Sequence, residues 1–291
     1  MHKTVLVTGA TGFLGGHVTP ALISRGYRVV AALRASSDAS RLPAQALRVD
    51  IESAPLESTL RQYSVDAIVH LACDQGRAGA SIQALLNSNV LFGVRLLEAA
   101  CSAHVTRFLN ADTQLEPGVN AYALSKKQLT QWLPHFCATL RIANLRLGNI
   151  YGPGEPANGF LAWLLNEFRR DAESIDFTPG EQLRDFVHAT DVSDAMLHVL
   201  EQQAVAGYEE YDVGSGEMLS LRQFVELAHA EFSRQAGPLR ARLEFGALPY
   251  RAGEVMQPRF DTSGLFALGW RPGLSTRERL EQTIRAFLQN L

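Results

Sequence analysis

A tyrosine and a lysine lie four positions apart in the segment Tyr122-Ala123-Leu124-Ser125-Lys126. Residues with this spacing share one face of a helix, so the phenol and the ammonium group would be neighbours. The lysine charge would then lower the pKa of the phenol, which could exchange a proton near neutral pH. The pair predicts an acid/base centre, although a tyrosine and a lysine with this spacing are also common on helix surfaces.

A glycine-rich loop lies near the start of the chain, in Thr8-Gly9-Ala10-Thr11-Gly12-Phe13-Leu14-Gly15. Its three glycines permit a tight turn, a close approach of the backbone to a pyrophosphate, and close packing of a helix on a strand. Three glycines can also simply form a turn, but the apolar run before them and the helical pattern after them favour a nucleotide loop. The helix N-terminus would offer N–H groups to the anion. The predicted cofactor contacts in the loop are Gly9, Thr11, Gly12, Phe13 and Leu14.

The end of the second predicted strand indicates which dinucleotide binds. NAD enzymes usually place Asp or Glu there, where the acid bonds the ribose 2′-hydroxyl. This chain has Leu33-Arg34-Ala35-Ser36-Ser37 and no acid before Asp38. A guanidinium can hold a 2′-phosphate with two hydrogen bonds, so Arg34 favours NADP(H). The alternative is a solvent-facing Arg34, with NAD(H) as the cofactor.

Apolar runs typical of strands buried on both faces alternate with helical patterns through the first two thirds of the chain. The predicted strands are 5–7, 29–33, 67–71, 107–109 and 143–147. The clearest helix is 85–103, and Pro20 should kink or shorten the first helix. Alternating strands and helices form βαβ units, and therefore predict an α/β fold with a doubly wound parallel sheet.

The regular pattern ends near Tyr151, where the breaker cluster Gly152-Pro153-Gly154-Glu155-Pro156 follows. Two helical segments come later, at 221–234 and 276–289. We therefore expect a dinucleotide-binding Rossmann domain over 1–150, with a returning segment at about 185–215. A smaller C-terminal α/β lobe for the substrate is expected over 151–184 and 216–291.

Composition excludes several other classes of protein. The 291 residues are 46% hydrophobic and 20% charged, with 27 basic and 30 acidic side chains and a net charge of −3. A chain with this profile can bury a sizeable core, and without a basic cluster it does not resemble a nucleic-acid-binding protein. No apolar stretch is long enough for a membrane helix, and the start lacks a signal-peptide pattern. We expect a soluble cytoplasmic protein.

Three cysteines are too few for a disulfide framework, and their spacing suggests no metal site, so we expect buried thiols. His70 and His188 fall at strand positions and are expected to be core residues. Phe224, Leu227 and Ala228 are expected to form the core face of a helix.

Taken in order, these motifs resemble the extended short-chain dehydrogenase/reductase family, and within it the nucleotide-sugar epimerases, dehydratases and 4-ketoreductases. The resemblance covers nearly the whole chain. A weaker similarity, to CDP-abequose synthase-type 4-ketoreductases, rests on Asn110-Ala111-Asp112-Thr113 and on Tyr122 through Gln128. Further segments that carry the family resemblance are Val49-Asp50-Ile51, His70-Leu71-Ala72, Asn89-Val90, Leu145 through Pro153, Arg184 through His188, and Leu268-Gly269-Trp270-Arg271-Pro272.

The resemblance implies a catalytic set of Thr113, Tyr122 and Lys126. Tyr122 would be the acid/base at the sugar oxygen, Thr113 would orient that oxygen, and Lys126 would bond the nicotinamide ribose and tune Tyr122. The cofactor contacts implied beyond the glycine loop and Arg34 are Asp50, Ile51, Leu71, Ala72, Asn89, Tyr122, Lys126 and Leu147. The implied substrate contacts are Thr113, Asn149, Arg184 and Arg251. Thr113 has an alternative as a turn residue, and Arg184 has one as an ion-pair partner of Asp185 or Asp191.

Departures from the family pattern narrow the class of reaction that the chain is expected to catalyse. The family's dehydratases follow the threonine with an Asp-Glu pair, whereas Gln114 and Leu115 follow Thr113 here. The 3,5-epimerase/reductases pair Cys with His in this region, and neither lies beside Thr113. Only eight residues separate Thr113 from Tyr122, which is short for the loop that normally covers the sugar.

We therefore expect reduction of the C4 ketone of a nucleoside-diphosphate 4-keto-6-deoxyhexose, with Tyr122 as proton donor. The same residues would serve an NAD-dependent nucleotide-sugar 4-epimerase, and a non-catalytic NADP(H)-sensing regulator is the third alternative. The resemblance also implies a homodimer formed by helices near 85–103 and 121–133. No metal, nucleic acid or membrane partner is expected.

Overall fold

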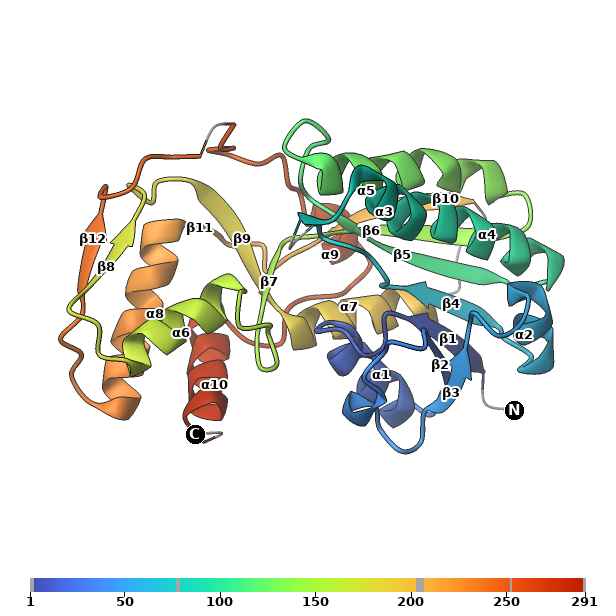
Figure 1. The fold of residues 1–291 in the computed structure, drawn as a ribbon, viewed down its shortest axis with the longest axis horizontal. Helices are drawn as coiled ribbons and strands as arrows, with labels where there is room; N and C mark the ends of the chain where they lie inside the picture. The colour runs from blue at the N-terminus through green and yellow to red at the C-terminus, as the bar shows by residue number, and fades with distance from the viewer. Residues whose placement is uncertain (1–2, 77–78, 203–206, 252, 290–291) are drawn as a thin grey trace. The chain divides into compact units, whose positions relative to one another are not determined.

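The computed structural model describes residues 3–76, 79–202, 207–251 and 253–289, and Figure 1 shows the fold. The chain divides into two compact units. The first consists of Met1–Leu147 and Ser193–Asp212, and the second of Gly148–Val192 and Val213–Leu291. The chain therefore leaves the first unit at the end of one strand and returns to it within a single helix, α7 (Ala189–Glu201).

The first unit is built on a sheet of seven strands in the order β10-β6-β5-β4-β1-β2-β3. Neighbouring strands from β6 to β3 run parallel. The order reverses between β1 and β4, which in doubly wound sheets creates a binding crevice at the carboxyl ends of the strands. The predicted α/β fold with a doubly wound parallel sheet is confirmed. The strands are β1 (Thr4–Thr8), β2 (Arg28–Leu33), β3 (Leu47–Asp50), β4 (Ala67–His70), β5 (Arg107–Thr113), β6 (Arg141–Leu147) and β10 (Tyr208–Val213).

One face of this sheet is covered by α2 (Leu56–Gln62), α4 (Phe92–Ser102) and α5 (Ala121–Trp132), and α4 and α5 lie side by side in Figure 1. Leu60, Leu97 and Leu129 from these helices join Ile68 and Phe108 of the strands in one buried apolar cluster. Burial of such side chains contributes about 1.5–3 kcal/mol each to folding. A main hydrophobic core of the first unit therefore lies between these helices and this face of the sheet.

The helix that precedes α4 continues into it without a break. Its parts are α3 (Ile82–Leu86), a π-helical turn (Asn87–Leu91) and α4. Within the described part of the chain, this segment is the only helix long and apolar enough to cross a membrane. Gly93 packs so closely on α5 that a Cβ there would lie 2.6 Å from a methyl carbon of Leu129. The buried side chains of the helical segment 82–102 thus make this segment a core helix of the first unit.

The opposite face is covered by α1 (Gly15–Ser24) and by the part of α7 in the first unit. Arg25, directly after α1, holds Glu201 of α7 at 2.9 Å and Asp194 at 3.1 Å. Pro20 lies inside α1, and the helix continues through it to Ser24. The proline therefore does not end the helix.

The second unit contains two small sheets. In the first, β9 (Leu183–His188) pairs antiparallel with β11 (Met218–Ser220) and parallel with β7 (Asn149–Tyr151). In the second, β8 (Ser174–Phe177) and β12 (Arg242–Phe245) are parallel. The returning segment expected at 185–215 thus divides at α7, because β9 stays in the second unit and only β10 joins the large sheet.

Aromatic packing holds the second unit together. The rings of Phe186 on β9 and Phe224 on α8 stack with centroids 3.8 Å apart. Phe224 and Ala228 are fully buried and Leu227 is partly buried, so the expected core face of this helix is confirmed. Ser220 and Gln223 form a capping box that starts the helix. The helices of this unit are α6 (Phe160–Arg169), α8 (Leu221–Ala236), α9 (Ser263–Ala267) and α10 (Thr276–Gln289).

Candidate active site

The glycine loop packs directly against the end of β4. Gly9 has φ +68°, and a Cβ there would lie 2.8 Å from the backbone nitrogen of Ala72. A Cβ at Gly15 would lie 2.2 Å from the carbonyl oxygen of Gly9, so only glycine allows α1 to begin this close to β1. No described side chain caps the first turn of α1. The N–H groups of Gly16 and His17 donate to the carbonyls of Gly12 and Leu14 at 2.9 and 3.0 Å, so backbone bonds close this turn. The glycines allow the close backbone approach that a pyrophosphate needs. The loop therefore fits a dinucleotide pyrophosphate.

A buried histidine joins the two strands that flank this loop. The Nδ1 atom of His70 lies 2.7 Å from the hydroxyl oxygen of Thr8, which also accepts a hydrogen bond from the N–H of Ala72. Burial, followed by the charge of Lys126, lowers the pKa of His70 to about 3. His70 is therefore neutral at physiological pH, and its expected role as a core residue is confirmed.

Arg34 lies in an exposed turn after β2. Its N–H donates to the hydroxyl of Ser37 at 3.0 Å, and its carbonyl accepts from the N–H of Ser37 at 2.9 Å. These bonds fix the backbone and leave the guanidinium exposed. The side chain is thus accessible to a ligand at the end of β2.

The residues predicted to contact the adenine lie beside this turn, at the end of β3. The N–H of Ile51 donates to the carbonyl of Leu33 at 3.0 Å, and exposed Asp50 accepts from the N–H of Glu52 at 2.8 Å. The carboxylate of Glu52 in turn accepts from the N–H of Ala35 at 3.4 Å. Glu52 was not predicted from the sequence, because an acid that bonds the cofactor ribose is expected directly after β2 and Glu52 follows β3.

The predicted catalytic residues come together at the ends of β5 and α5. Asn120 caps α5 by accepting a hydrogen bond from the N–H of Ala123 at 2.8 Å, so Tyr122 lies in the first helical turn. The phenol of Tyr122 lies within hydrogen-bonding reach of the Thr113 hydroxyl and of the Cys73 thiol. Lys126, one helical turn further along α5, is buried. The structure thus brings Thr113 and Tyr122 into contact.

The pKa of Tyr122 is raised well above its ordinary value. Burial is the largest cause, followed by the charges of Cys73 and Asp112, while the hydrogen bond with Thr113 acts in the opposite direction. This is the reverse of the shift expected from the charge of Lys126. The phenol is therefore fully protonated at neutral pH, as a proton donor must be.

An ion pair between a partly buried lysine and a buried aspartate lies beside these residues and was not anticipated from the sequence. The Nζ atom of Lys127 lies 2.7 Å from Oδ2 of Asp112 and donates to the carbonyl of Thr113 at 2.6 Å. The side chain of Asp112 is fully buried. The available signal was an acid directly before Thr113 and a second lysine directly after Lys126.

Asn89 and Leu147, both expected to contact the cofactor, are buried. The Asn89 amide group donates to the Ser125 hydroxyl and to the Asp74 carbonyl, both at 2.8 Å, and its oxygen accepts from the N–H of Asp74 at 2.7 Å. Leu147 ends β6, and its carbonyl accepts from the N–H of Gln114. In this structure Asn89 connects α5 to the loop after β4.

The predicted substrate residues other than Thr113 all belong to the second unit. Asn149 begins β7, opposite Phe186 of β9. Arg184 pairs with Glu254 and donates to the carbonyl of Val255 at 2.7 Å. Arg251 is exposed, and its carbonyl accepts from the N–H of Glu254 at 3.0 Å. Arg184 thus lies against the segment that carries Arg251.

Neither of the acids named as alternative partners of Arg184 pairs with it. Asp185 is buried and accepts from the N–H groups of Ser215 and Gly216 at 2.6 and 2.8 Å. Asp191 pairs with Arg279 at 2.5 Å. The ion-pair partner of Arg184 is Glu254, which lies far away in the sequence.

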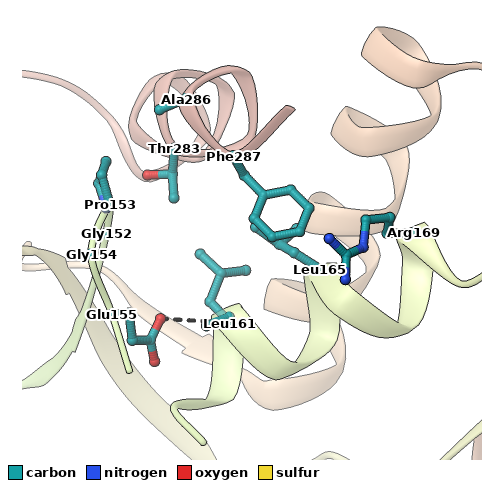
Figure 2. Close-up of a pocket in the computed structure, with 11 residues that line it drawn as sticks. Gly152, Pro153, Gly154, Glu155, Leu161, Leu165, Arg169, Thr283, Ala286 and Phe287 are labelled. Carbon is teal, nitrogen blue, oxygen red and sulfur yellow. Dashed lines mark hydrogen bonds between the residues drawn. The ribbon is translucent and has the colours of Figure 1, made fainter. Parts of the chain in front are cut away.

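A cavity of about 230 Å³ opens in the second unit, between α6, α10 and the loop before α6 (Figure 2). Leu161, Leu165 and Phe287 form its apolar wall, and the Arg169 guanidinium lies 6.0 Å from the Phe287 ring centroid. Glu155, at its other side, accepts from the N–H of Ala162 at 3.3 Å. The described residues that line this cavity include none of the predicted substrate contacts.

The cysteines differ from expectation. Cys73 is exposed, and Cys101 and Cys137 are only partly buried, so the prediction of buried thiols is wrong. Cys73 follows β4, where the chain emerges at the carboxyl end of the sheet. Nothing in the sequence position of Cys73 predicted that its thiol would lie within hydrogen-bonding reach of Tyr122.

Residues 5–214 match the model of a family described as the NAD dependent epimerase/dehydratase family. This chain belongs to that family. The resemblance to the extended short-chain dehydrogenase/reductases is thereby confirmed, and with it the expectation that the chain is an enzyme. The glycine loop and the Thr113–Tyr122 contact lie within the matched region.

Several family members with known names match the chain over almost its full length. It is 29% identical to the CDP-abequose synthase of Salmonella typhimurium, covering 98% of both chains. It is 27% identical to the dTDP-6-deoxy-L-talose 4-dehydrogenase (NAD(P)(+)) of Kitasatospora kifunensis, over 96% of this chain and 93% of that one. The structure of the Thermus thermophilus UDP-glucose 4-epimerase in complex with NAD is similar at TM-score 0.81, with 25% identity over 99% and 100% of the two chains.

Proposed function

We propose that the protein reduces the C4 ketone of a nucleoside-diphosphate 4-keto-6-deoxyhexose with NADPH. The observation that carries the proposal is the contact of a protonated Tyr122 with the hydroxyl of Thr113 at the carboxyl end of the sheet. A protonated phenol can donate to a developing alkoxide, which is what ketone reduction requires. The glycine loop in the same unit fits the cofactor.

In this mechanism, a bound reduced nicotinamide supplies the hydride to C4 of the sugar. Tyr122 donates its proton to the C4 oxygen as negative charge develops there. The hydroxyl of Thr113 holds the same oxygen and fixes its direction relative to the phenol. Lys126, buried one turn along α5, would bond the nicotinamide ribose and return Tyr122 to its acid form.

The preference for NADPH rests on Arg34. Its guanidinium is exposed at the end of β2, where a 2′-phosphate would lie. Glu52 argues against this preference. Its carboxylate accepts from the N–H of Ala35, in the turn that carries Arg34, and an acid there suits the 2′-hydroxyl of NAD. The name of the Kitasatospora relative includes both cofactors.

The proposed substrate class rests on the relatives, whose names contain CDP-, dTDP- and UDP-linked sugars. Asn149, Arg184 and Arg251 are the proposed contacts for the nucleoside diphosphate. A 4-epimerase is the second candidate, because one solved relative with NAD is a UDP-glucose 4-epimerase. A non-catalytic NADP(H) sensor is disfavoured, since it would not require Thr113 and Tyr122 in contact.

We also propose a homodimer. Large apolar side chains are exposed along the helix 82–102 and α5, among them Ile82 (61%), Leu91 (54%) and Trp132 (49%). Exposed apolar surface of this kind marks protein–protein interfaces. Analytical ultracentrifugation should show a dimer that Leu91→Arg weakens, and a monomer at all concentrations would contradict the proposal.

The reaction is tested by following NADPH absorbance with a nucleotide-linked 4-keto-6-deoxyhexose. We expect stoichiometric NADPH consumption and a product hydroxylated at C4. In a parallel reaction, nucleotide-linked hexoses without added cofactor should remain unchanged. Interconversion of C4 epimers in the second reaction, without net loss of NADPH in the first, would instead establish the epimerase.

A further inference from the structure

We propose that the Asp112–Lys127 ion pair is a positioning device for the acid, which holds Thr113, and with it the hydroxyl that faces Tyr122, in place. The inference rests on the proposed function, since it concerns the acid of that reaction. Neither residue would touch the substrate. They would act through Thr113 and Tyr122.

The geometry connects the pair to both catalytic groups. Lys127 makes two short contacts, one to the Asp112 carboxylate at 2.7 Å and one to the Thr113 carbonyl at 2.6 Å. The second contact fixes the backbone of the residue whose hydroxyl lies beside the Tyr122 phenol. Lys127 thus anchors the end of β5 to α5 at the point where Thr113 and Tyr122 meet.

Asp112 is held from several other directions. Its Oδ2 atom also accepts from the Asn144 amide at 3.2 Å and from the Thr130 hydroxyl at 3.3 Å. Its Oδ1 atom is buried and has no hydrogen-bond partner among the described residues. A carboxylate with one oxygen unsatisfied and no solvent exposure acts on nearby groups with little screening.

The charge of Asp112 reaches Tyr122 and raises the pKa of its phenol. The other groups around the phenol are Cys73, which also raises its pKa, and the Thr113 hydroxyl, which lowers it. His70 is neutral in the neutral and alkaline range, because burial and the charge of Lys126 on α5 lower its pKa to about 3. Asp112 is therefore the only described carboxylate among the main contributors to this shift.

The charge of Asp112 affects which protonation state of Tyr122 is populated when each step begins. In the reduction, hydride adds to C4 and the Tyr122 proton goes to the C4 oxygen, which leaves a phenolate and an oxidised nicotinamide. The reverse oxidation begins with the phenolate, which removes the proton of the C4 hydroxyl. A nearby carboxylate disfavours the phenolate, so the ion pair favours the acid needed for reduction.

The experiment compares Asp112→Asn, Lys127→Met and the double variant. Two readouts are used: the pH dependence of kcat/KM for ketone reduction by NADPH, and the tyrosinate absorbance of the NADP-loaded enzyme on alkaline titration. The titration of Tyr122→Phe is subtracted to isolate the signal of Tyr122. Asp212→Asn is the matched control for Asp112→Asn, since Asp212 is a buried carboxylate paired with Arg146 at 2.5 Å.

Asp112→Asn should move the alkaline limb of reduction and the tyrosinate midpoint to lower pH by about one unit, because a charge is removed and Lys127 remains. Lys127→Met should move both to higher pH. The double variant should fall between Asp112→Asn and the unaltered enzyme, and Asp212→Asn should leave both quantities unchanged. Opposite shifts from the two single variants are not expected of a pair that serves stability alone.

Unshifted titrations in Asp112→Asn, or shifts in the same direction in both single variants, would overturn the proposal. Removing one member of a buried pair strongly destabilises a fold, so circular dichroism must show folded protein. If a single variant is unfolded, the double variant is used in its place. A tyrosinate midpoint of Tyr122 in the double variant equal to that of the unaltered enzyme would then overturn the proposal. If no nucleotide-linked ketose is turned over, the proposed function fails, whereas the tyrosinate titration still decides the role of the pair.

Discussion

The imidazole of His70 lies 2.7 Å from the hydroxyl of Thr8, and this contact joins β4 to β1 where the strand order reverses. Both side chains are fully buried. The contact positions the glycine loop after β1 against Ala72 after β4, whose N–H donates to Thr8. The geometry of the cofactor loop therefore depends on a neutral histidine beneath it.

Stability should fall with acid because of His70. Its pKa is about 3 in the folded protein and 6.5 in the unfolded chain, so below pH 6.5 only the unfolded chain takes up the proton. The free energy of unfolding should drop by about 2 kcal/mol between pH 7 and pH 5 from this group alone. Urea unfolding at both pH values measures the drop.

His70→Gln provides the comparison for this measurement. The variant has no group that titrates at this position, so the His70 contribution to the pH dependence should disappear. An equal drop in both proteins would show that His70 is not the source.

Gly15→Ala should disrupt the cofactor loop. The added methyl would lie 2.2 Å from the carbonyl oxygen of Gly9, and neither backbone segment can move without shifting a strand or a helix. We expect a loss of about 1–3 kcal/mol in stability and at least about tenfold weaker NADPH binding. Calorimetric titration and urea unfolding measure the two effects.

Gly16→Ala is the matched control for this prediction. A Cβ at Gly16 meets nothing within 4 Å, and alanine favours a helix more than glycine does. This variant should bind NADPH normally and unfold at the same or a higher urea concentration. Equal damage from both substitutions would contradict the packing argument.

Tyr122→Phe should lower turnover about 10²-fold or more, since the proton donor is lost and little volume changes. NADPH affinity should change little, because the phenol faces Thr113 and Cys73. Steady-state kinetics and cofactor titration separate the two quantities. Near-normal turnover would show that another group is the acid.

Arg34→Ala should weaken NADPH binding by about 1.5–3 kcal/mol through loss of a charge-assisted contact, and should leave NADH binding nearly unchanged. Calorimetric titration of both cofactors into both proteins measures this. Glu52→Gln, at the same turn, should instead weaken NADH alone if that carboxylate meets a ribose hydroxyl. Tighter binding of NADH than of NADPH by the unaltered protein would refute the preference for NADP(H).

The sequence by itself determined the features that depend on local backbone geometry and periodicity. Gly9 and Gly15 predicted a tight turn. The structure shows why glycine is required there, since a Cβ at either position would collide with neighbouring backbone atoms. The alternation of apolar runs with helical patterns predicted the doubly wound sheet, because buried parallel strands need apolar side chains on both faces. Family motifs added Thr113 opposite Tyr122, which the structure brings into contact.

Tertiary structure decided what depends on residues distant in the sequence. Only the fold shows that β9 stays in the second unit while β10 joins the large sheet, and that Arg184 pairs with Glu254. Likewise, no spacing rule connects Cys73 or Asp112 with Tyr122. Their proximity and the burial of the phenol raise its pKa, whereas the local Tyr–Lys pattern predicted the reverse. Electrostatics depends on distance and solvent exposure, and both are set by packing between elements rather than by order along the chain.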